Sequence, residues 1–328
     1  MKGTLMRQHT QSGAAGARIL AFGGYQPARE VTNAELATTV DTSDEWIRSR
    51  VGIESRRIAA PDETVADMAV AAGGKALAAS GLAAQDIDLV IVATCTVEAQ
   101  IPNTAATVGR RLGIPAPGAY DLNAACAGFC YALANASDAV RTGTARHVLV
   151  VGAEKLSQWI DWTDRSTCII FADGAGAAVV GPVPDGGTPG IGPVVWGSAG
   201  DMAEKIYITD RNSFIFQEGQ SVFRWATTAL HPVGLAACER AGVAPSDLAA
   251  FIPHQANLRI IESIARKLGA PQALVADDIV TAGNTSSASI PLALSRMLER
   301  DEIASGAPVL LLGFGAGICY AGQVITVP

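Results

Sequence analysis

A cysteine flanked by small residues is the first candidate for chemistry in this sequence. Cys126 stands in the segment Asp121-Leu-Asn-Ala-Ala-Cys-Ala-Gly-Phe129, where a helix is predicted to begin. A thiol at a helix N-terminus lies near free N–H groups and the positive end of the dipole, which lower its pKa below about 8.5. We therefore expect Cys126 to be a nucleophile. The alternative for any single cysteine is a buried structural thiol.

Two further polar residues are suited to assist a cysteine nucleophile. His254 lies in Phe251-Ile-Pro-His-Gln-Ala-Asn257, where a predicted apolar strand ends and a helix begins, a position that catalytic loops favour. Asn284 lies in the polar segment Thr281-Ala-Gly-Asn-Thr-Ser-Ser-Ala-Ser-Ile-Pro291. A capping or surface role for the histidine and a turn role for the asparagine are the alternatives.

The elements that must position these residues occur twice. The apolar segment 148–152 (VLVVG) corresponds to 309–313 (VLLLG), and 108–113 (VGRRLG) corresponds to 264–269 (IARKLG), in the same order. The apolar run 87–94 is typical of a buried strand, and helical patterns follow such runs. We expect an α/β protein built from two stacked copies of one unit, with corresponding helices meeting at their termini.

The repeat also relates the candidate site residues. The shift of 161 residues from 148 to 309 carries Cys126 onto Ser287, which we expect, with Ser286, to cap a helix. The Asn284 loop should therefore lie opposite the nucleophile. The glycine-rich segment Gly313-Phe-Gly-Ala-Gly-Ile318 follows the repeated strand, and its N–H groups are suited to an oxyanion hole.

A segment rich in Gly and Pro, residues 181–193, separates the two copies. We expect a flexible N-terminal lead over residues 1–16 and a first half over 17–181, which holds the cysteine. A connection over 182–193 would lead to a second half over 194–328, which holds the histidine and the asparagine.

Composition excludes several classes of protein. With 49% hydrophobic and 17% charged residues the chain is too apolar for a disordered protein, and its net charge of −7 argues against nucleic-acid or membrane partners. The six cysteines form no CxxC pair, which indicates free thiols in a reducing compartment. No apolar run reaches the roughly 18 residues of a membrane span or forms a secretory signal, so we expect a cytoplasmic protein.

Together these motifs resemble the β-ketoacyl-acyl-carrier-protein synthase III family of the thiolase superfamily. The resemblance rests on Cys126, His254 and Asn284 in their motifs, the glycine-rich segment after them, and two further stretches, Asp41–Ile47 and Phe171–Ala177. It implies a duplicated thiolase-like fold of five layers, αβαβα, and a homodimer. One departure is Ala316, which replaces a glycine of the family's usual run.

The resemblance implies a decarboxylating condensation of a short-chain acyl-CoA primer with malonyl-acyl carrier protein, which initiates type II fatty-acid synthesis. Cys126 would attack the thioester, and its own N–H and that of Ala316 would form the oxyanion hole. His254 and Asn284 would donate hydrogen bonds to the enolate. Acyl-CoA is a substrate in this scheme, and neither a permanently bound cofactor nor a metal is expected.

The coenzyme A end of the site has its own signals. Thr42-x-x-Glu45 has the pattern of a capping box, which would start a helix with Trp46 and Arg50 on one face. An indole and a guanidinium one turn apart can hold an adenine ring, although an exposed surface pair is the alternative. By resemblance, the coenzyme A contacts are Thr42, Trp46, Arg50 and Arg165, with Asn257 near the pantetheine arm.

The resemblance also assigns an acyl pocket and a docking face. Ile101 and Phe314 would line the pocket, with Ile101 reaching its floor from the partner subunit, where relatives can have phenylalanine. Because isoleucine is smaller, we expect branched or four-to-five-carbon primers to be accepted besides acetyl. A basic helix face would dock the acidic carrier protein through Arg259, Arg266 and Lys267, although such a face is usually just solvated.

Three other functions remain open. A polyketide-priming or ester-forming condensing enzyme would use the same three residues. A non-catalytic partner subunit typically lacks the cysteine that this chain retains. A cysteine hydrolase would need a general base beside the thiol and open access for water.

Overall fold

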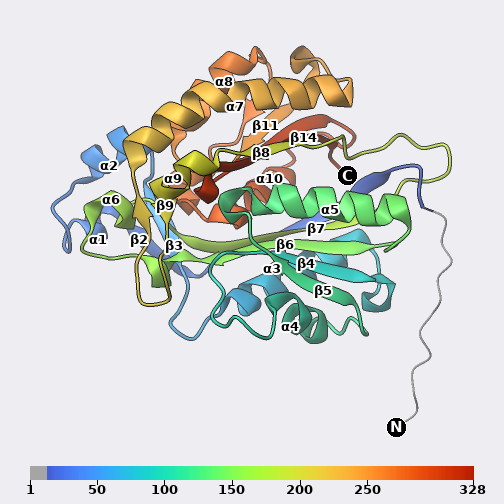
Figure 1. Cartoon of the computed structure of the whole chain (residues 1–328), viewed down its shortest axis with the longest axis horizontal. Helices are drawn as coiled ribbons and strands as arrows, with labels where there is room; N and C mark the ends of the chain where they lie inside the picture. Colours follow the sequence, from blue (N-terminus) through green and yellow to red (C-terminus); the bar gives the residue numbers. More distant parts are fainter. Residues whose placement is uncertain (1–12) are drawn as a thin grey trace, which may run out of the picture.

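The computed structural model describes residues 13–328, and most of the predicted flexible lead, 1–12, lies outside the described residues. Two five-stranded sheets form the framework (Figure 1). The first has the order β1 (Ala17–Tyr25), β7 (Asp173–Pro182), β6 (Val148–Lys155), β4 (Leu89–Ala93), β5 (Gly118–Leu122). The second has the order β8 (Val195–Ser198), β14 (Cys319–Thr326), β13 (Pro308–Phe314), β11 (Ala250–Pro253), β12 (Leu274–Val275).

The strands of the two sheets pair in the same sense, position by position. In the first sheet β4 is parallel to β5 and β6, while β7 is antiparallel to β6 and β1. In the second sheet β11 is parallel to β12 and β13, while β14 is antiparallel to β13 and β8. The predicted equivalence of segments 148–152 and 309–313 is confirmed, because these segments form the central strands β6 and β13.

Helices complete five layers, as Figure 1 shows. The helices α5 (Gly128–Thr142) and α10 (Ser289–Glu299) lie between the sheets. The outer face of the first sheet carries α3 (Val65–Ser80) and α4 (Thr104–Arg111), and that of the second carries α7 (Gly219–Ala241) and α8 (Leu258–Leu268). This is the αβαβα arrangement that the family resemblance implies, and it confirms the two stacked copies predicted from the repeat.

The central helices are apolar because both of their faces are covered. On α5, Phe129, Leu133 and Ala136 have no exposed surface, and on α10 the same holds for Ala293 and Leu294. Burying a leucine or phenylalanine side chain contributes about 1.5–3 kcal/mol. The predicted ends of α5 and α8 are confirmed, with Gly143 and Gly269 in the left-handed conformation at φ 77° and 68°.

Smaller elements lie around one end of the central layer. They are β2 (Arg29–Thr32), α1 (Asn33–Leu36), α2 (Asp44–Val51), β3 (Ser55–Ile58), α6 (Arg165–Cys168), β9 (Ile206–Tyr207), β10 (Phe216–Gln217) and α9 (Ile279–Ala282). Short 3-10 turns are η1 (Ala84–Asp86), η2 (Ala125–Ala127), η3 (Leu156–Trp159), η4 (Gly200–Lys205), η5 (Pro245–Asp247), η6 (Ser286–Ala288) and η7 (Ala316–Ile318). Residues 183–194, which join β7 to β8, form no strand apart from a single bridge at Ile191.

Candidate active site

The cysteine lies in a strained turn that precedes a central helix. Cys126 belongs to η2, directly before α5. Its neighbour Ala125 has a left-handed backbone, with φ 46°, and the Asn123 side chain holds this turn by accepting the Ala125 N–H at 3.1 Å. Left-handed backbone is costly for a residue with a Cβ and persists where the surroundings enforce it. The turn therefore fixes the direction of the thiol.

The second half contains the same turn before α10. Ser286 has φ 51°, and Asn284 Oδ1 accepts the Ser286 N–H at 2.8 Å. The Asn284 side chain is buried, and its backbone is held by hydrogen bonds with Ile170 and Ala172. Since the oxygen of the amide is engaged by Ser286, the amide nitrogen Nδ2 remains to donate into the pocket.

Ser286 and Ser287 do not cap the helix, contrary to the sequence prediction. Helix α10 begins three residues after Ser286, and no side chain caps it. The two hydroxyls instead donate to the buried carboxylate of Glu154, at 3.0 and 2.8 Å. The η6 turn directs them toward β6 rather than along the helix axis, and sequence spacing cannot reveal this direction.

His254 follows β11 and is buried, with 2% of its surface exposed. Its Nδ1 lies 2.7 Å from Ser289 Oγ, and its ring meets the Phe314 ring edge-on at 5.2 Å. Because Ser289 Oγ accepts the Gln255 N–H at 3.3 Å, its own proton is available to Nδ1. This leaves the N–H on Nε2. Burial lowers the pKa of His254 to about 3, so the ring is neutral.

The predicted low pKa of Cys126 is wrong. Burial raises the pKa of this thiol to about 12, and the Glu154 charge adds to the rise. The Ser286 hydroxyl and the N–H groups of Cys126 and Ala316 act in the opposite direction. The start of α5 was correctly predicted. Desolvation between the two sheets, however, has a larger effect on the pKa of Cys126 than the dipole at the helix start.

The two N–H groups predicted to hold an oxyanion both face the sulfur. The Ala316 N–H opens η7, and the Cys126 N–H belongs to the nucleophile turn. A Cβ added at Gly315 would lie 2.6 Å from the Cys126 nitrogen, so the loop passes the cysteine at backbone distance. This close approach explains the glycine at position 315.

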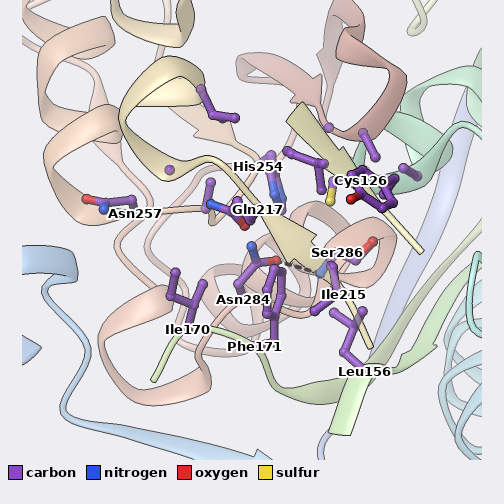
Figure 2. Close-up of a pocket in the computed structure, with 18 of the residues that line it drawn as sticks. Cys126, Leu156, Ile170, Phe171, Ile215, Gln217, His254, Asn257, Asn284 and Ser286 are labelled. Carbon is purple, nitrogen blue, oxygen red and sulfur yellow. Dashed lines mark hydrogen bonds between the residues drawn. The ribbon is translucent and has the colours of Figure 1, made fainter. Parts of the chain in front are cut away.

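A pocket of about 1370 Å³ connects these groups to the surface, and Cys126, His254 and Asn284 all line it. Figure 2 shows the three side chains gathered there, from η2, the loop after β11 and the turn before α10. The walls near them are apolar, formed by Leu156, Ile170, Phe171, Ile215 and Phe314. The structure thus brings together the three residues that the sequence singled out.

At its outer part the pocket is lined by Trp46 and Arg50 of α2. The guanidinium of Arg50 lies 5.6 Å from the centre of the Trp46 ring, and that of Arg165 lies 4.6 Å from it. The helix start predicted at Thr42 is wrong by one residue, because Ser43 Oγ accepts the Trp46 N–H at 3.1 Å. Ser43, the residue that caps the helix, has an extended backbone, and the Thr42 hydroxyl is buried without a hydrogen-bond partner.

The other predicted binding residues fall into two groups. Asn257 lines the pocket, caps α8 and donates a hydrogen bond to the Arg50 carbonyl. Arg259 also lines the pocket, and its guanidinium lies over the Phe223 ring. Arg266 and Lys267 are exposed farther along α8 and outside the pocket, and Lys267 donates to the Thr227 carbonyl of α7.

The two residues predicted for the acyl pocket lie apart. Phe314 is buried beside His254. Ile101 is 86% exposed and does not line the pocket of its own chain, although its neighbour Gln100 does. The assignment of Ile101 to a partner's pocket stays a prediction.

Sequence reasoning missed several residues of the site. Gln217 and Ile215, at the end of the β9–β10 hairpin, line the pocket, and Figure 2 labels both beside the three central residues. Arg211 lies in the same hairpin, and Arg224 lies on α7. Two short apolar runs, 206–208 and 214–216, flank a polar turn and are the signal for this hairpin. Nothing in these runs indicates what the hairpin covers.

Residues 13–328 contain no group of three or more His, Cys, Asp or Glu side chains arranged to hold a metal ion. Within the same range no helix combines the length and apolar character needed to cross a membrane.

The stacked repeat, the half-buried thiol and the buried imidazole and carboxamide at one pocket define the class: a thiolase-fold condensing enzyme that transfers acyl groups. Family models described as 3-oxoacyl-[acyl-carrier-protein (ACP)] synthase III and its C-terminal part match residues 120–200 and 238–327. The chain belongs to the 3-oxoacyl-[acyl-carrier-protein] synthase III family.

Individual relatives agree with this assignment. The chain is 58% identical over 313 residues to β-ketoacyl-[acyl-carrier-protein] synthase III 2 of Streptomyces avermitilis, covering 95% of this chain and 99% of the relative. The priming β-ketosynthase of the R1128 polyketide pathway is 44% identical, with a TM-score of 0.93 over 97% of this chain and 98% of that structure. The synthase III of Aquifex aeolicus is 39% identical, with a TM-score of 0.90 over 95% of this chain and 100% of that structure.

Proposed function

We propose that this chain condenses a short-chain acyl-CoA primer with malonyl-acyl carrier protein, releasing CO2 and giving a 3-oxoacyl-acyl carrier protein. The observation that carries the proposal is the meeting of Cys126, His254 and Asn284 in one pocket. A thiol beside two N–H donors favours acyl transfer to carbon, because such donors stabilise the oxyanion and the enolate.

In the first half-reaction the Cys126 sulfur attacks the primer thioester. The tetrahedral oxyanion accepts hydrogen bonds from the N–H groups of Cys126 and Ala316, which both face this sulfur. One such donor contributes about 10²–10³ to the rate in comparable sites. The bond to the coenzyme A sulfur then breaks, and the acyl group stays on the cysteine.

In the second half-reaction the malonyl group loses CO2, and its thioester oxygen becomes an enolate oxygen. His254 Nε2–H and Asn284 Nδ2–H are the donors for this oxygen, because the other polar atoms of both side chains are engaged by Ser289 and Ser286. A neutral imidazole and an amide keep their N–H at any pH near 7. The resulting carbanion attacks the acyl-Cys126 carbonyl and releases the thiolate.

The substrates are proposed to meet the outer pocket through aromatic and basic groups. Trp46, Arg50 and Arg165 form a cation–π cluster suited to an adenine ring and its phosphates. The exposed basic side chains of Arg259, Arg266 and Lys267 on α8 suit an acidic carrier protein.

A homodimer is part of the proposal. Strand β5 lies at the edge of the first sheet, pairs only with β4 among the described strands, and exposes 37% of Tyr120. An unpaired edge is a template for pairing with a second copy. The exposed Ile101 follows β4 in the chain and would reach the partner's pocket in such a pair.

The test is intact-mass analysis after incubation with mixed acyl-CoAs, followed by malonyl-acyl carrier protein. We expect an acyl adduct that Cys126→Ala abolishes, and a 3-oxoacyl product on the carrier protein. If the protein is stable but forms no adduct, the result would favour a non-catalytic subunit. If the protein releases free carboxylic acid from acyl-CoA without malonyl-acyl carrier protein, the result would favour a hydrolase.

A second candidate is a polyketide-priming or ester-forming role. The 44% identical neighbour is a priming β-ketosynthase of a polyketide pathway, and the same three residues would serve that role. Comparing carrier proteins from fatty-acid and polyketide systems, and malonyl-carrier protein with malonyl-CoA, separates the two. A preference of at least tenfold for a polyketide carrier protein would favour the second candidate.

A further inference from the structure

Glu154, at the end of β6, is a buried charge that the chemistry described above does not use. Its side chain has no exposed surface, and no ion pair within residues 13–328 includes it. Burying a carboxylate without a cation is expensive unless hydrogen bonds compensate. The compensating donors are Thr94 Oγ1, Cys95 N, Cys95 Sγ, Thr96 Oγ1, Ser286 Oγ and Ser287 Oγ.

One of these donors connects the carboxylate to the nucleophile. Ser286 Oγ lies 3.0 Å from Glu154 Oε1 and 3.8 Å from Cys95 Sγ. The same hydroxyl acts on the Cys126 thiol and lowers its pKa, and Figure 2 shows Ser286 and Cys126 lining one pocket. Cys95 and Cys126 are the titratable side chains near the carboxylate. The ammonium of Lys155 points away, toward the carbonyls of Ala60, Pro61 and Glu63. Sulfur, hydroxyl and carboxylate thus form a short path away from the pocket.

We propose that Glu154 receives the Cys126 proton through the Ser286 hydroxyl when the cysteine is acylated. The inference rests on the proposed function and adds to it the route by which a buried thiol becomes a nucleophile. Glu154 acts through Ser286 and is a positioning and proton-holding residue, whereas Cys126 touches the substrate.

The step balances without another reactant. As the sulfur–carbon bond forms, the Cys126 proton passes to Ser286 Oγ, and the Ser286 proton passes to Glu154 Oε1. The tetrahedral intermediate then breaks its bond to the coenzyme A sulfur, which leaves as a thiolate. Ser286 Oγ then gives its proton to that thiolate and takes back the proton held by Glu154, which is again a carboxylate.

The structure accommodates both protonation states of Glu154. Ser287 Oγ lies 2.8 Å from Glu154 Oε1 and also 2.8 Å from the Ala93 carbonyl oxygen. While Glu154 is ionised, the Ser287 hydroxyl donates to it. Once Glu154 is protonated, the Ser287 hydroxyl turns to the Ala93 carbonyl and its oxygen accepts the new carboxyl proton.

His254 is not available for this step. The Ser289 hydroxyl occupies Nδ1, which leaves Nε2 as a donor without a lone pair for a proton. The carboxylate is therefore the acceptor that the geometry offers to the thiol.

The first test is Ser286→Ala, which removes the connecting hydroxyl. Ala125 occupies the equivalent left-handed position in the first half, so alanine fits this backbone. We expect acylation of Cys126 by acyl-CoA at pH 7 to slow by about 10²-fold. The acylation rate of the variant should rise about tenfold per pH unit between pH 7 and 9, because solvent must now remove the proton. The wild-type rate should change little over this range.

The second test is Glu154→Gln. An electrostatic role and a proton-accepting role of Glu154 predict opposite changes in the acylation rate of this variant. The Glu154 charge raises the pKa of Cys126, so electrostatics alone predicts faster acylation in the variant. Loss of a proton acceptor predicts acylation slower by at least 10²-fold. The matched control is Thr94→Val, which removes another hydroxyl on the same carboxylate, 3.2 Å from Oε2 and outside the pocket. We expect it to change acylation less than about threefold.

Decarboxylation of malonyl-acyl carrier protein by each variant is the readout for the folded site, since it depends on His254 and Asn284. The proposal predicts near wild-type decarboxylation with slow acylation. Equal loss of both half-reactions in Ser286→Ala, an unchanged pH profile, or faster acylation by Glu154→Gln would overturn it. If the wild-type chain formed no acyl adduct, the proposed function itself would fail, and this inference with it.

Discussion

The Ser289 hydroxyl lies 2.7 Å from His254 Nδ1 and accepts the Gln255 N–H, which assigns the imidazole proton to Nε2. One side chain on a central helix therefore decides what the histidine offers the pocket. Without this hydroxyl the proton would be free to sit on Nδ1, and Nε2 would become an acceptor facing an enolate.

Replacing this hydroxyl should affect one half-reaction. For Ser289→Ala we expect the rate of decarboxylation of malonyl-acyl carrier protein to fall by about tenfold or more. This is less than the loss expected when a donor is removed outright, because the imidazole remains in place. The rate of Cys126 acylation should stay within about threefold of wild type. The control is Ser295→Ala, farther along α10, whose hydroxyl donates to Glu299 at 3.3 Å. Separate rates for the two half-reactions check this expectation, and equal losses in both would contradict it.

Asn284 offers a substitution that separates its two roles. Asn284→Asp keeps an oxygen to accept the Ser286 N–H and loses the Nδ2 donor. We expect decarboxylation to slow by about 10²–10³-fold with little change in thermal stability. Asn284→Ala loses the turn bond too and should melt at a lower temperature. A fully active aspartate variant would remove Asn284 from the enolate site.

The raised pKa of Cys126 predicts the pH dependence of alkylation. With a pKa of about 12, the thiolate is a minor species at pH 7, and its fraction rises about tenfold per pH unit. Iodoacetamide modification of the Ser286→Ala protein, in which the proposed proton path is broken, should therefore keep accelerating above pH 9. Mass spectrometry of the Cys126 peptide measures this rate. A plateau below pH 8 would show that the helix dipole outweighs burial.

The stacking of Arg165 on Trp46, at 4.6 Å, predicts a binding defect without a chemical one. Trp46→Ala should raise KM for acyl-CoA by about tenfold, because cation–π and stacking contacts contribute about 1–2 kcal/mol. The maximal acylation rate should change little. An acyl-pantetheine thioester, which lacks the adenine, serves as the control because its KM should not respond. An equal rise for both thioesters would place the adenine elsewhere.

Primer choice tests the role of Ile101. The wild-type protein should accept branched and four-to-five-carbon acyl-CoAs, and Ile101→Phe should narrow this range toward acetyl-CoA by filling the pocket of the partner. One extra or missing methylene in an apolar pocket changes the ratio of kcat/KM values for two substrates by about 10–200-fold. Competition between acetyl-CoA and isobutyryl-CoA, read as adduct mass, measures the effect. An unchanged ratio would mean that Ile101 does not reach the pocket.

The repeat is the part of the fold that local pattern could predict. The segments 148–152 and 309–313 are continuous apolar runs because β6 and β13 are covered on both faces, and the helix ends at Gly143 and Gly269 follow from backbone freedom. The positions of Cys126, His254 and Asn284 beside predicted helix starts indicate the site from the sequence alone.

Other features depended on the surroundings of a side chain. Thr42 and Ser43 both have side chains that can cap a helix. In the structure Ser43 is the cap, and its backbone is extended. Ser286 and Ser287 have the residue type of caps, but they donate to Glu154, which lies 132 and 133 residues earlier in the chain. Nothing near Glu154 in the sequence indicates that its carboxylate is buried beside a thiol.

The sequence by itself determined the element types, the duplication and the identity of the three central residues, because these follow from periodicity, backbone preference and side-chain chemistry. Only the tertiary structure decided the protonation of the site. Stacking the two halves half-buries Cys126 and buries His254, which raises the pKa of the thiol and lowers that of the imidazole. Desolvation is a property of the assembled layers, and no local stretch of sequence carries it.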